Sequence, residues 1–281
     1  MIWRGVWRRW PRRASKSALV VVASGVSPCQ ALAEMVASTH DGIRVSVVAP
    51  CFDEVEGIEA VVRTWDAVLE KQPYRSEIVL CDDGSTDGTH LVLARLRAEF
   101  ARLVVVTLPQ NGGYGKALSS AIAASRGAVI VTLDSDGQFD LNDGVELVRL
   151  LDERALDCVT GYRIRKADSP LRVVADRGLN RLVRGLFGVD LTDTNCALKA
   201  VRGERLRGLR IEARGYPTPT EIVVRLVAAG AAVGEAPVRH YERTAGQSKL
   251  RPFRTAWAMA RFLFYLRSRL GLYRDRIIVE P

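Results

Sequence analysis

Short hydrophobic runs alternate with longer amphipathic stretches along the chain from Ile43 onward. The runs are rich in Val, Ile and Leu and have little polar alternation, which is typical of strands buried on both faces of a sheet. The stretches between them carry hydrophobic residues at helical spacing. The predicted strands are 45–49, 77–81, 103–108 and 128–133, and the predicted helices are 55–70, 87–100 and 115–126. This alternation predicts an α/β domain whose mostly parallel sheet has helices on both faces.

The second half of the chain continues the alternation in a looser form. Its predicted strands are 157–160, 197–201 and 232–238, and its predicted helices are 171–187, 219–229 and 253–272. The last of these helices mixes aromatic residues and Leu with Arg. We therefore expect a basic, poorly ordered tail (residues 1–40), one α/β domain (41–250) and a C-terminal amphipathic helix (251–281).

The distribution of charge argues against a nucleic-acid partner. The chain of 281 residues has a formal net charge of +9. Residues 1–40 contain six basic residues and one acidic residue, and residues 250–281 contain seven basic and two acidic residues, so the predicted α/β domain is close to neutral. A nucleic-acid-binding domain normally carries its positive charge within the fold. No hydrophobic run approaches the roughly 20 residues that a membrane-spanning helix needs.

The cysteines and histidines limit the redox and metal chemistry. The five cysteines form no C-x-x-C pair, and Cys51, Cys81 and Cys158 lie in or beside predicted strands. Buried free thiols in a reducing compartment explain this arrangement better than disulfides or zinc. The three histidines are far apart in the sequence and lack metal-ligand spacing.

An acidic loop follows the second predicted strand, at the edge where parallel α/β sheets bind ligands. Asp82 and Asp83 open the sequence Asp-Asp-Gly-Ser-Thr-Asp-Gly. A helix cap formed by Ser85 or Thr86 would account for Asp87 near the helix start. It does not account for two adjacent carboxylates, which repel each other unless a donor or a cation meets them. We therefore favour ligand binding over capping alone for this pair.

The loop after the fourth predicted strand gives stronger evidence of a metal-binding site. Asp134, Asp136 and Gln138 alternate with Ser135 and Gly137. Oxygen donors at this spacing can reach one hard cation, Mg²⁺ or Mn²⁺, with phosphate oxygens completing its shell. A D-x-D motif alone is weak evidence for a metal site. A D-x-D-x-Q motif after the fourth strand, combined with an Asp-Asp loop after the second, is strong evidence. The sequence has no P-loop, no dinucleotide-binding glycine motif and no credible Ser-His-Asp or Cys-His nucleophile set.

Six motifs, in order, make the chain resemble family 2 glycosyltransferases of the GT-A (Rossmann-like) fold. They are Val47–Glu54, Asp82–Thr89, Asn111–Ala117, Asp134–Gln138, Gly161–Arg163 and Gly246–Lys249. The branch that it resembles transfers mannose or glucose to dolichyl or polyprenyl phosphate. The resemblance implies inverting, metal-dependent transfer of a hexose from GDP-mannose, UDP-glucose or another nucleotide sugar. It also implies peripheral association with the cytosolic face of a membrane.

The resemblance implies a role for each matching residue. The nucleotide would lie against Pro50, Phe52 and Glu54, with Asp82 or Asp83 contacting the base or ribose. The sugar diphosphate would meet Asp134, Ser135 and Asp136, and the metal ion would be held by Asp134, Asp136 and Gln138. The donor diphosphate or the acceptor phosphate would meet Arg163, Arg243 and Lys249. The expected catalytic residues are Asp136, Arg163, Arg243 and Lys249.

One departure from the family pattern leaves the donor base and sugar open. Asp53 stands before Glu54 where the family often has Asn, and Phe52 stands where Tyr is frequent. The C-terminal membrane-spanning helices of longer family members are not expected here.

The residue types fit this chemistry on physical grounds as well. A metal ion would neutralise charge that develops on the leaving diphosphate, and Arg side chains would add bidentate stabilisation. A lipid phosphate is already anionic, so its attack on the anomeric carbon needs no strong base. Lys249 lies in a stretch with Gly246 and Ser248, which favours a mobile lid over a plain solvated loop charge.

The two ends of the chain allow alternative interpretations. Residues 1–40 combine basic residues, three Trp and an Ala-x-Ala pattern, as in a signal peptide. We favour a tail and a cytoplasmic location, because a nucleotide sugar is a cytosolic co-substrate. The helix at 253–272 either lies in an anionic membrane interface or packs on the body or on a second copy. Glu221, near a helix start, either pairs with the helix dipole or contacts the acceptor.

Two rival functions remain. One is the same fold acting on a soluble or glycan acceptor. The other is a non-catalytic nucleotide-sugar-binding protein, against which the intact set of metal-type and phosphate-type residues argues.

Overall fold

Seven strands form one sheet in the computed structural model, which describes residues 42–164, 170–242 and 252–275. The strands are β1 (Val45–Cys51), β2 (Ser76–Asp82), β3 (Leu103–Thr107), β4 (Val129–Thr132), β5 (Cys158–Arg163), β6 (Lys199–Arg202) and β7 (Val233–Val238). Their order across the sheet is β3-β2-β1-β4-β6-β5-β7. Among these strands β6 alone runs antiparallel to its neighbours. The predicted mostly parallel sheet is confirmed.

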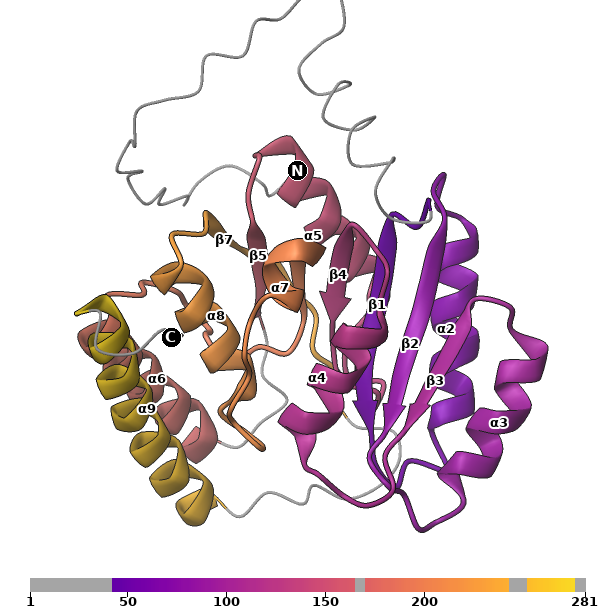
Figure 1. Cartoon of the computed structure of the whole chain (residues 1–281), viewed down its shortest axis with the longest axis horizontal. Helices are drawn as coiled ribbons and strands as arrows, with labels where there is room; N and C mark the ends of the chain where they lie inside the picture. Colours follow the sequence, from indigo (N-terminus) through magenta and orange to yellow (C-terminus); the bar gives the residue numbers. More distant parts are fainter. Residues whose placement is uncertain (1–41, 165–169, 243–251, 276–281) are drawn as a thin grey trace, which may run out of the picture.

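Helices cover both faces of the sheet (Figure 1). One face carries α2 (Ile58–Glu70), α3 (Thr89–Glu99) and α5 (Leu141–Glu153), and the other carries α4 (Tyr114–Ala124), α7 (Gly203–Arg207) and α8 (Thr218–Ala228). Adjacent residues of β1 enter opposite cores, Val47 the first and Val48 the second. All seven residues of β1 are buried, as expected for a strand between two helical layers.

A third hydrophobic cluster joins α8 to the remaining helices, α6 (Pro170–Phe187) and α9 (Pro252–Arg274). Helices α6 and α9 lie side by side in Figure 1 and are in contact. Met259, Leu263 and Leu266 form the buried face of α9. The C-terminal helix therefore packs on the body, as one of the two interpretations of the sequence holds. Within the described ranges, no helix combines the length and hydrophobicity needed to cross a membrane.

The start of α3 differs from the sequence prediction. Gly88, with φ +98°, precedes the helix, so Ser85 and Thr86 are not its N-cap. Asp87 instead accepts hydrogen bonds from the backbone N–H (2.9 Å) and the hydroxyl (2.6 Å) of Thr89. Burial acts to raise the pKa of Asp87, but these hydrogen bonds, together with one from the N–H of Val55 (3.1 Å), outweigh it and lower the pKa. Asp87 thus stabilises the helix start, as the capping argument expected of it.

The four cysteines of the described residues are buried, free thiols. Cys51, Cys81, Cys158 and Cys196 are free and buried, as predicted, while Cys29 lies outside the described residues. Burial raises the pKa of Cys81, Cys158 and Cys196 to about 12. Thiols that stay protonated at neutral pH are poor nucleophiles, so these cysteines contribute to packing.

Candidate active site

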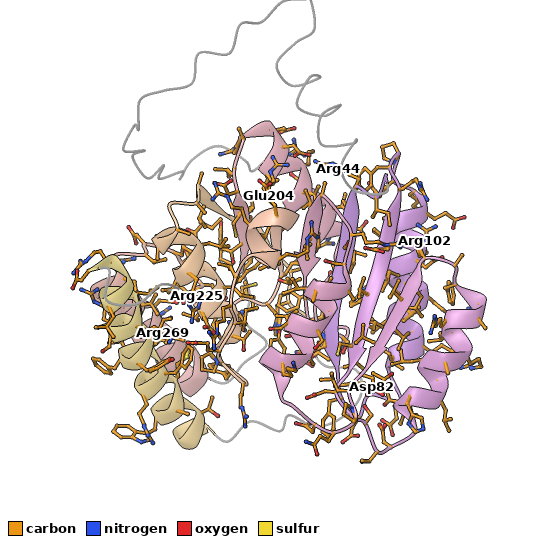
Figure 2. All side chains as sticks on the ribbon, viewed as in Figure 1. Arg44, Asp82, Arg102, Glu204, Arg225 and Arg269 are labelled. Carbon is orange, nitrogen blue, oxygen red and sulfur yellow. The ribbon has the colours of Figure 1, made fainter. Side chains whose placement is uncertain are left out.

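The carboxyl-terminal ends of β1, β2, β4 and β5 lie at one edge of the sheet, because these strands run in the same direction. The arrows of β1, β2 and β4 in Figure 1 point to this edge. Figure 2 shows Asp82 there, with Arg44 and Arg102 at the opposite edge. The acidic loops that the sequence singled out therefore meet along one rim.

Asp82 has one carboxylate oxygen to which no described residue donates a hydrogen bond. Its side chain is buried, and Oδ1 accepts hydrogen bonds from the backbone N–H (3.0 Å) and the hydroxyl (2.5 Å) of Ser85. Oδ2 is also buried, and none of the described residues donates to it. A buried carboxylate oxygen without a donor costs free energy. A ligand N–H or O–H at this rim would satisfy it.

Asp83 has a different task from its neighbour. Its Oδ1 accepts from the N–H of Gly112 (2.7 Å) and its Oδ2 from the N–H of Gly113 (2.9 Å). Both oxygens therefore hold the glycine-rich loop that opens α4. Of the two carboxylates predicted to meet the base or ribose, Asp82 is the one whose geometry fits that contact.

The loop after β1 is tied to the loop after β2. Asp53, in the left-handed region at φ +51°, accepts a hydrogen bond from the N–H of Thr86 (2.9 Å). The N–H of Glu54 donates to the hydroxyl of Thr89 (2.9 Å). Asp53, which departs from the family pattern, thus supports the loop from which Phe52 and Glu54 project, and all three are half-buried.

The loop after β4 is connected to both of these loops. The hydroxyl of Ser135 donates to the carbonyl of Pro50 (2.7 Å), and the phenol of Tyr114 donates to Oδ1 of Asp134 (2.8 Å). Burial raises the pKa of Tyr114 well above its usual value, and the charges of Asp134 and Asp136 raise it further. Both carboxylates thus lie close to one phenol, and Tyr114 acts as a neutral donor.

Gln138 joins the D-x-D loop to the segment after β7. Its side-chain amide donates to the carbonyl of Tyr241 (3.0 Å), and the N–H of Tyr241 donates to the carbonyl of Gln138 (2.9 Å). The N–H of Gln138 donates to Oδ1 of Asp136 (3.1 Å). Because the side-chain NH₂ is fixed in this way, the carbonyl end of the amide is the part that can meet a cation.

The donor set fits a hard divalent cation that is shared with a substrate. Asp134, Asp136 and Gln138 supply two carboxylates and one amide oxygen, which are ligands that Mg²⁺ and Mn²⁺ accept. Among the described residues, no three His, Cys, Asp or Glu side chains converge on one metal position. A cation here would need further oxygen ligands, which a diphosphate can provide.

Arg163, the last residue of β5, has an acidic partner that the sequence analysis did not predict. Its Nε lies 2.7 Å from Oδ2 of Asp193 and its Nη2 lies 3.1 Å from Oδ1. The side chains are only 9% and 3% exposed. Arg163 therefore reaches the rim as one half of a bidentate ion pair. Arg243 and Lys249, the other predicted phosphate contacts, lie outside the described residues.

Glu221 is part of the scaffold behind this rim. It is fully buried and accepts hydrogen bonds from the N–H of Glu212 (3.0 Å), the N–H of Ala213 (2.7 Å) and Nε of Arg225 (2.7 Å). These bonds hold Ala213 against α4, where a Cβ on Gly115 would lie 1.7 Å from the Ala213 carbonyl oxygen. The carboxylate binds protein groups, which favours a structural role over contact with the acceptor.

Three residues of this site escaped the sequence analysis. Tyr114 lies inside the quoted glycine motif, so its position was a usable signal. Asp193 lies in the polar stretch before β6, but nothing in the sequence pairs it with Arg163. Lys199, fully buried on β6, interrupts the hydrophobic residues of the predicted strand 197–201 and was a second usable signal.

Comparison with known proteins agrees with this geometry. The model of the family described as "Glycosyl transferase family 2" matches residues 46–201. The chain is 32% identical over 247 residues to the dodecaprenyl-phosphate galacturonate synthase of Rhizobium johnstonii, covering 85% of this chain and 72% of that protein. It is 36% identical over 210 residues to glycosyltransferase AglD of Haloferax volcanii, covering 72% of this chain and 34% of that one. The chain therefore spans about a third of the length of the second relative.

Solved structures share the fold. The glucosyl-3-phosphoglycerate synthase of Mycobacterium tuberculosis in complex with UDP superposes with a TM-score of 0.61 at 22% identity, covering 90% of this chain and 87% of that one. The same synthase with Mn²⁺ and UDP-glucose gives a TM-score of 0.61 at 23% identity, covering 89% and 85%. The predicted GT-A fold is confirmed.

Proposed function

The chain belongs to glycosyltransferase family 2, and from this premise we propose that it transfers a sugar from a nucleotide sugar to a polyprenyl phosphate. Transfer would be inverting, with a divalent cation at the donor diphosphate. One observation carries the proposal. The buried Oδ2 of Asp82, at the end of β2, and the carboxylates of Asp134 and Asp136, after the end of β4, lie at the same edge of the sheet on either side of β1.

The nucleoside end of the donor is assigned to the rim at β1 and β2. There Pro50 lies in β1, which pairs with β2, and the half-buried Phe52 and Glu54 follow in the loop after β1. A base N–H or a ribose hydroxyl would give Oδ2 of Asp82 the donor that none of the described residues supplies. This assignment leaves Asp83 to hold the glycine loop, so its part in nucleotide binding is indirect.

The diphosphate end is assigned to the loop after β4. Asp134, Asp136 and Gln138 would hold Mg²⁺ or Mn²⁺, whose chemistry here is the neutralisation of charge on the leaving diphosphate. Hydrogen bonds within the protein already fix two of these side chains: Tyr114 donates to Asp134, and the amide of Gln138 donates to the carbonyl of Tyr241. Fixed ligands lose little freedom on binding, which favours a rapid and selective reaction.

The proposed reaction is a single displacement at the anomeric carbon. An acceptor phosphate oxygen forms the new C–O bond while the bond to the nucleoside diphosphate breaks and its electron pair stays on the diphosphate. The attacking oxygen is already anionic, so no proton has to be removed. Arg163, with Arg243 and Lys249 from outside the described residues, would stabilise the phosphate charges. A single displacement inverts the configuration.

The acceptor class rests on the sequence motifs and on the Rhizobium relative, whose name specifies dodecaprenyl phosphate. The motifs predict mannose or glucose as the sugar, and the relative's name adds galacturonate to the candidates. A soluble or glycan acceptor, and nucleotide-sugar binding without catalysis, are the outcomes against which the proposal is tested.

A peripheral position at the cytosolic membrane face is supported by the outer side of α9. Trp257 and Phe264 are 69% and 56% exposed there, while Arg261 and Arg267 are exposed on the same helix. Hydrophobic side chains among Arg residues are typical of a helix that lies in an anionic interface. The two interpretations of this helix are compatible, since its inner face packs on α6.

Vesicle binding tests this membrane position. Loss of co-sedimentation with anionic vesicles in a Trp257→Ser, Phe264→Ser variant would support the position, and undiminished binding would refute it.

A competition experiment tests the function. The purified chain receives a labelled nucleotide sugar with a short isoprenyl phosphate and a soluble sugar alcohol in the same tube. We expect label in the isoprenyl product only, and none with Asp136→Ala. Equal labelling of the soluble acceptor would refute the acceptor class. Full activity of Asp136→Ala would refute the metal assignment.

A further inference from the structure

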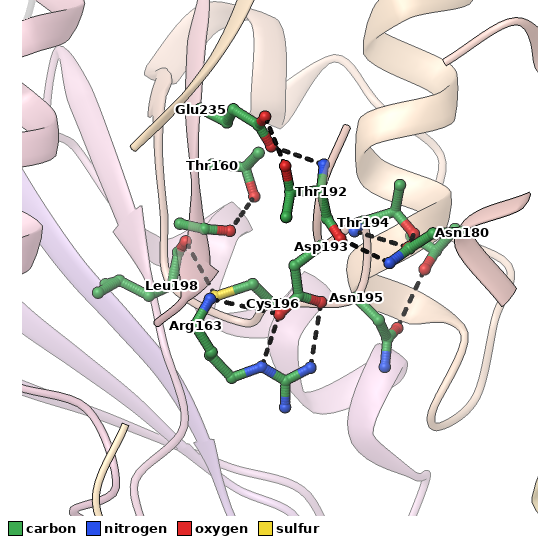
Figure 3. A network of polar contacts seen from close by, with 12 residues as sticks. Thr160, Arg163, Asn180, Thr192, Asp193, Thr194, Asn195, Cys196, Leu198 and Glu235 are labelled. Carbon is green, nitrogen blue, oxygen red and sulfur yellow. Dashed lines mark hydrogen bonds and ion pairs between the residues drawn. The ribbon is translucent and has the colours of Figure 1, made fainter. Parts of the chain in front are cut away.

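The loop between α6 and β6 is fixed by two neighbouring elements at its start (Figure 3). Glu235 of β7 accepts hydrogen bonds from the N–H (2.7 Å) and the hydroxyl (2.8 Å) of Thr192. Asn180 of α6 donates to the carbonyl of Thr192 (2.6 Å) and accepts from the hydroxyl of Thr194 (2.8 Å). The residue between these two threonines, Asp193, therefore has neighbours fixed on both sides.

The end of the same loop is fixed as firmly. The hydroxyl of Thr220 on α8 donates to Oδ1 of Asn195 (3.1 Å). The ammonium group of Lys199 donates to the carbonyl of Cys196 and to the hydroxyl of Thr160 on β5 (2.9 Å). Lys199 is fully buried, and burial lowers its pKa. It links the loop to the strand whose last residue is Arg163.

Asp193 projects from this fixed loop onto Arg163. The two carboxylate oxygens face Nε and Nη2 of the guanidinium, the fork arrangement that Figure 3 shows. A fork of two parallel hydrogen bonds sets the plane of the guanidinium as well as its position. A guanidinium has five N–H groups, and Asp193 engages the Nε and Nη2 side of it.

Stability alone is a poor explanation for this pair. Taking two charges out of water costs about as much as their attraction returns, so buried ion pairs contribute little net stability compared with hydrophobic residues. What a bidentate pair supplies is orientation of a long side chain that otherwise samples many rotamers. Arg163 lies at the rim, where it is paired with Val238 of β7. Two residues after Val238, His240 forms a β-bridge with Phe139, which follows the D-x-D loop.

We infer that Asp193 is a positioning residue for Arg163: it holds the guanidinium at the rim in the orientation that meets a substrate phosphate oxygen. The loop bonds to Glu235, Asn180, Thr220 and Lys199 keep Asp193 itself in place. The inference rests on the proposed function, because it assumes that Arg163 contacts a phosphate group of the donor or the acceptor.

Chemical rescue tests the inference. Arg163→Ala removes the guanidinium, and free guanidinium ion is then added to the assay. If Asp193 preforms the position, guanidinium restores part of the transfer in Arg163→Ala but not in the Arg163→Ala, Asp193→Asn double variant. A structural role of Asp193 would not make rescue depend on it. Rescue of both variants to the same extent, or of neither, would overturn the inference.

Steady-state kinetics provide a second test of the inference. Asp193→Asn should lower kcat/KM roughly tenfold to a hundredfold, the usual range for a residue that orients another. The double variant should be no worse than Arg163→Ala, because both changes remove one contact. If the fold-losses in kcat/KM of the two single variants multiply in the double variant, the two residues act independently and the inference is overturned. Asp152→Asn, which removes a carboxylate paired with Arg44 and Arg202 away from the site, is the matched control and should keep full activity.

A binding measurement separates failure of the inference from failure of the proposed function. Calorimetry with a short isoprenyl phosphate and with a nucleoside diphosphate needs no turnover. Equal loss of binding in Arg163→Ala and Asp193→Asn would support the inference even if the wild type transfers no sugar. Unchanged binding of both ligands in both variants would overturn it. Thermal unfolding of each variant checks that it is folded.

Discussion

The phenol of Tyr114 lies 2.8 Å from Oδ1 of Asp134 and connects the glycine loop before α4 to the D-x-D loop after β4. Asp83 holds the same glycine loop through Gly112 and Gly113. The loops after β2, β3 and β4 thus form one chain of contacts along the rim. A ligand that binds to one of these loops meets the other two already in place.

Tyr114→Phe tests whether this bond positions the metal ligand. We expect roughly tenfold to a hundredfold weaker Mn²⁺ binding, because a hydrogen bond to a charged group contributes about 1.5–3 kcal/mol. Titration with Mn²⁺, followed by the paramagnetic signal of the free ion, measures the affinity without turnover. Tyr265→Phe, which removes a phenol on α9 that donates to Glu212, is the control. Equal Mn²⁺ affinity of the Tyr114 variant and the wild type would show that the bond has no such role.

Asp82→Asn tests the assignment of the nucleoside. The substitution replaces one oxygen of a buried carboxylate with an NH₂ group, which cannot accept the hydrogen bond of a base or ribose. We expect nucleoside diphosphate affinity to fall roughly tenfold to a hundredfold by calorimetry. Thr86→Ala, in the same loop but exposed, should bind normally. If Asp82→Asn binds as tightly as the wild type, the nucleoside lies elsewhere.

Gly115→Ala tests the close packing of the Ala213 loop on α4. The new Cβ would lie 1.7 Å from a carbonyl oxygen, so the backbone has to move. We expect a loss of at least about 1–3 kcal/mol in the free energy of unfolding, measured with urea. Gly178→Ala on α6, where a Cβ meets nothing within 4 Å, should instead gain about 0.5–1 kcal/mol. Equal effects of the two substitutions would contradict the packing account.

The buried Lys199 predicts a dependence of stability on pH. Burial lowers its pKa below the usual 10.5, so the unfolded chain binds more protons at this group than the folded chain between the lowered value and 10.5. The free energy of unfolding attributable to Lys199 therefore rises with pH through that window. Lys199→Met should remove this rise, measured by urea unfolding from neutral pH to about 10.5. Lys71→Met, at an exposed position, should keep it. An identical slope in Lys199→Met and the wild type would contradict the account.

The sheet was predictable because buried parallel strands leave an unambiguous pattern. The hydrophobic runs around Val47, Ile78 and Val131 can be recognised in the sequence alone, since the two cores on either side of the sheet favour hydrophobic residues at most positions of these strands. Two helices, α5 and α7, were not predicted. The first has the usual alternation of a surface helix, with Asp140 accepting from the N–H of Asn142 as its N-cap, and was missed. The second is only five residues long.

The site could be predicted from the sequence where its functional residues lie close together along the chain. Asp134, Asp136 and Gln138 follow one strand within five residues, so their shared position can be read directly. The separate roles of Asp82 and Asp83 could not be read, because they depend on which backbone groups each oxygen meets after folding. The pairing of Arg163 with Asp193 joins positions 30 residues apart. Only the antiparallel insertion of β6 beside β5 brings them together.

The central claim is sugar transfer to a polyprenyl phosphate, and its most direct test is a donor panel in a two-phase assay. Labelled UDP-glucose, UDP-galacturonate and GDP-mannose are each offered with polyprenyl phosphate, with and without EDTA, and the organic phase is counted. We expect label in the organic phase from one of these donors, and none when EDTA is present. Measurable donor binding with no lipid label from any donor would contradict the claim, and label that persists in EDTA would contradict the role of the metal.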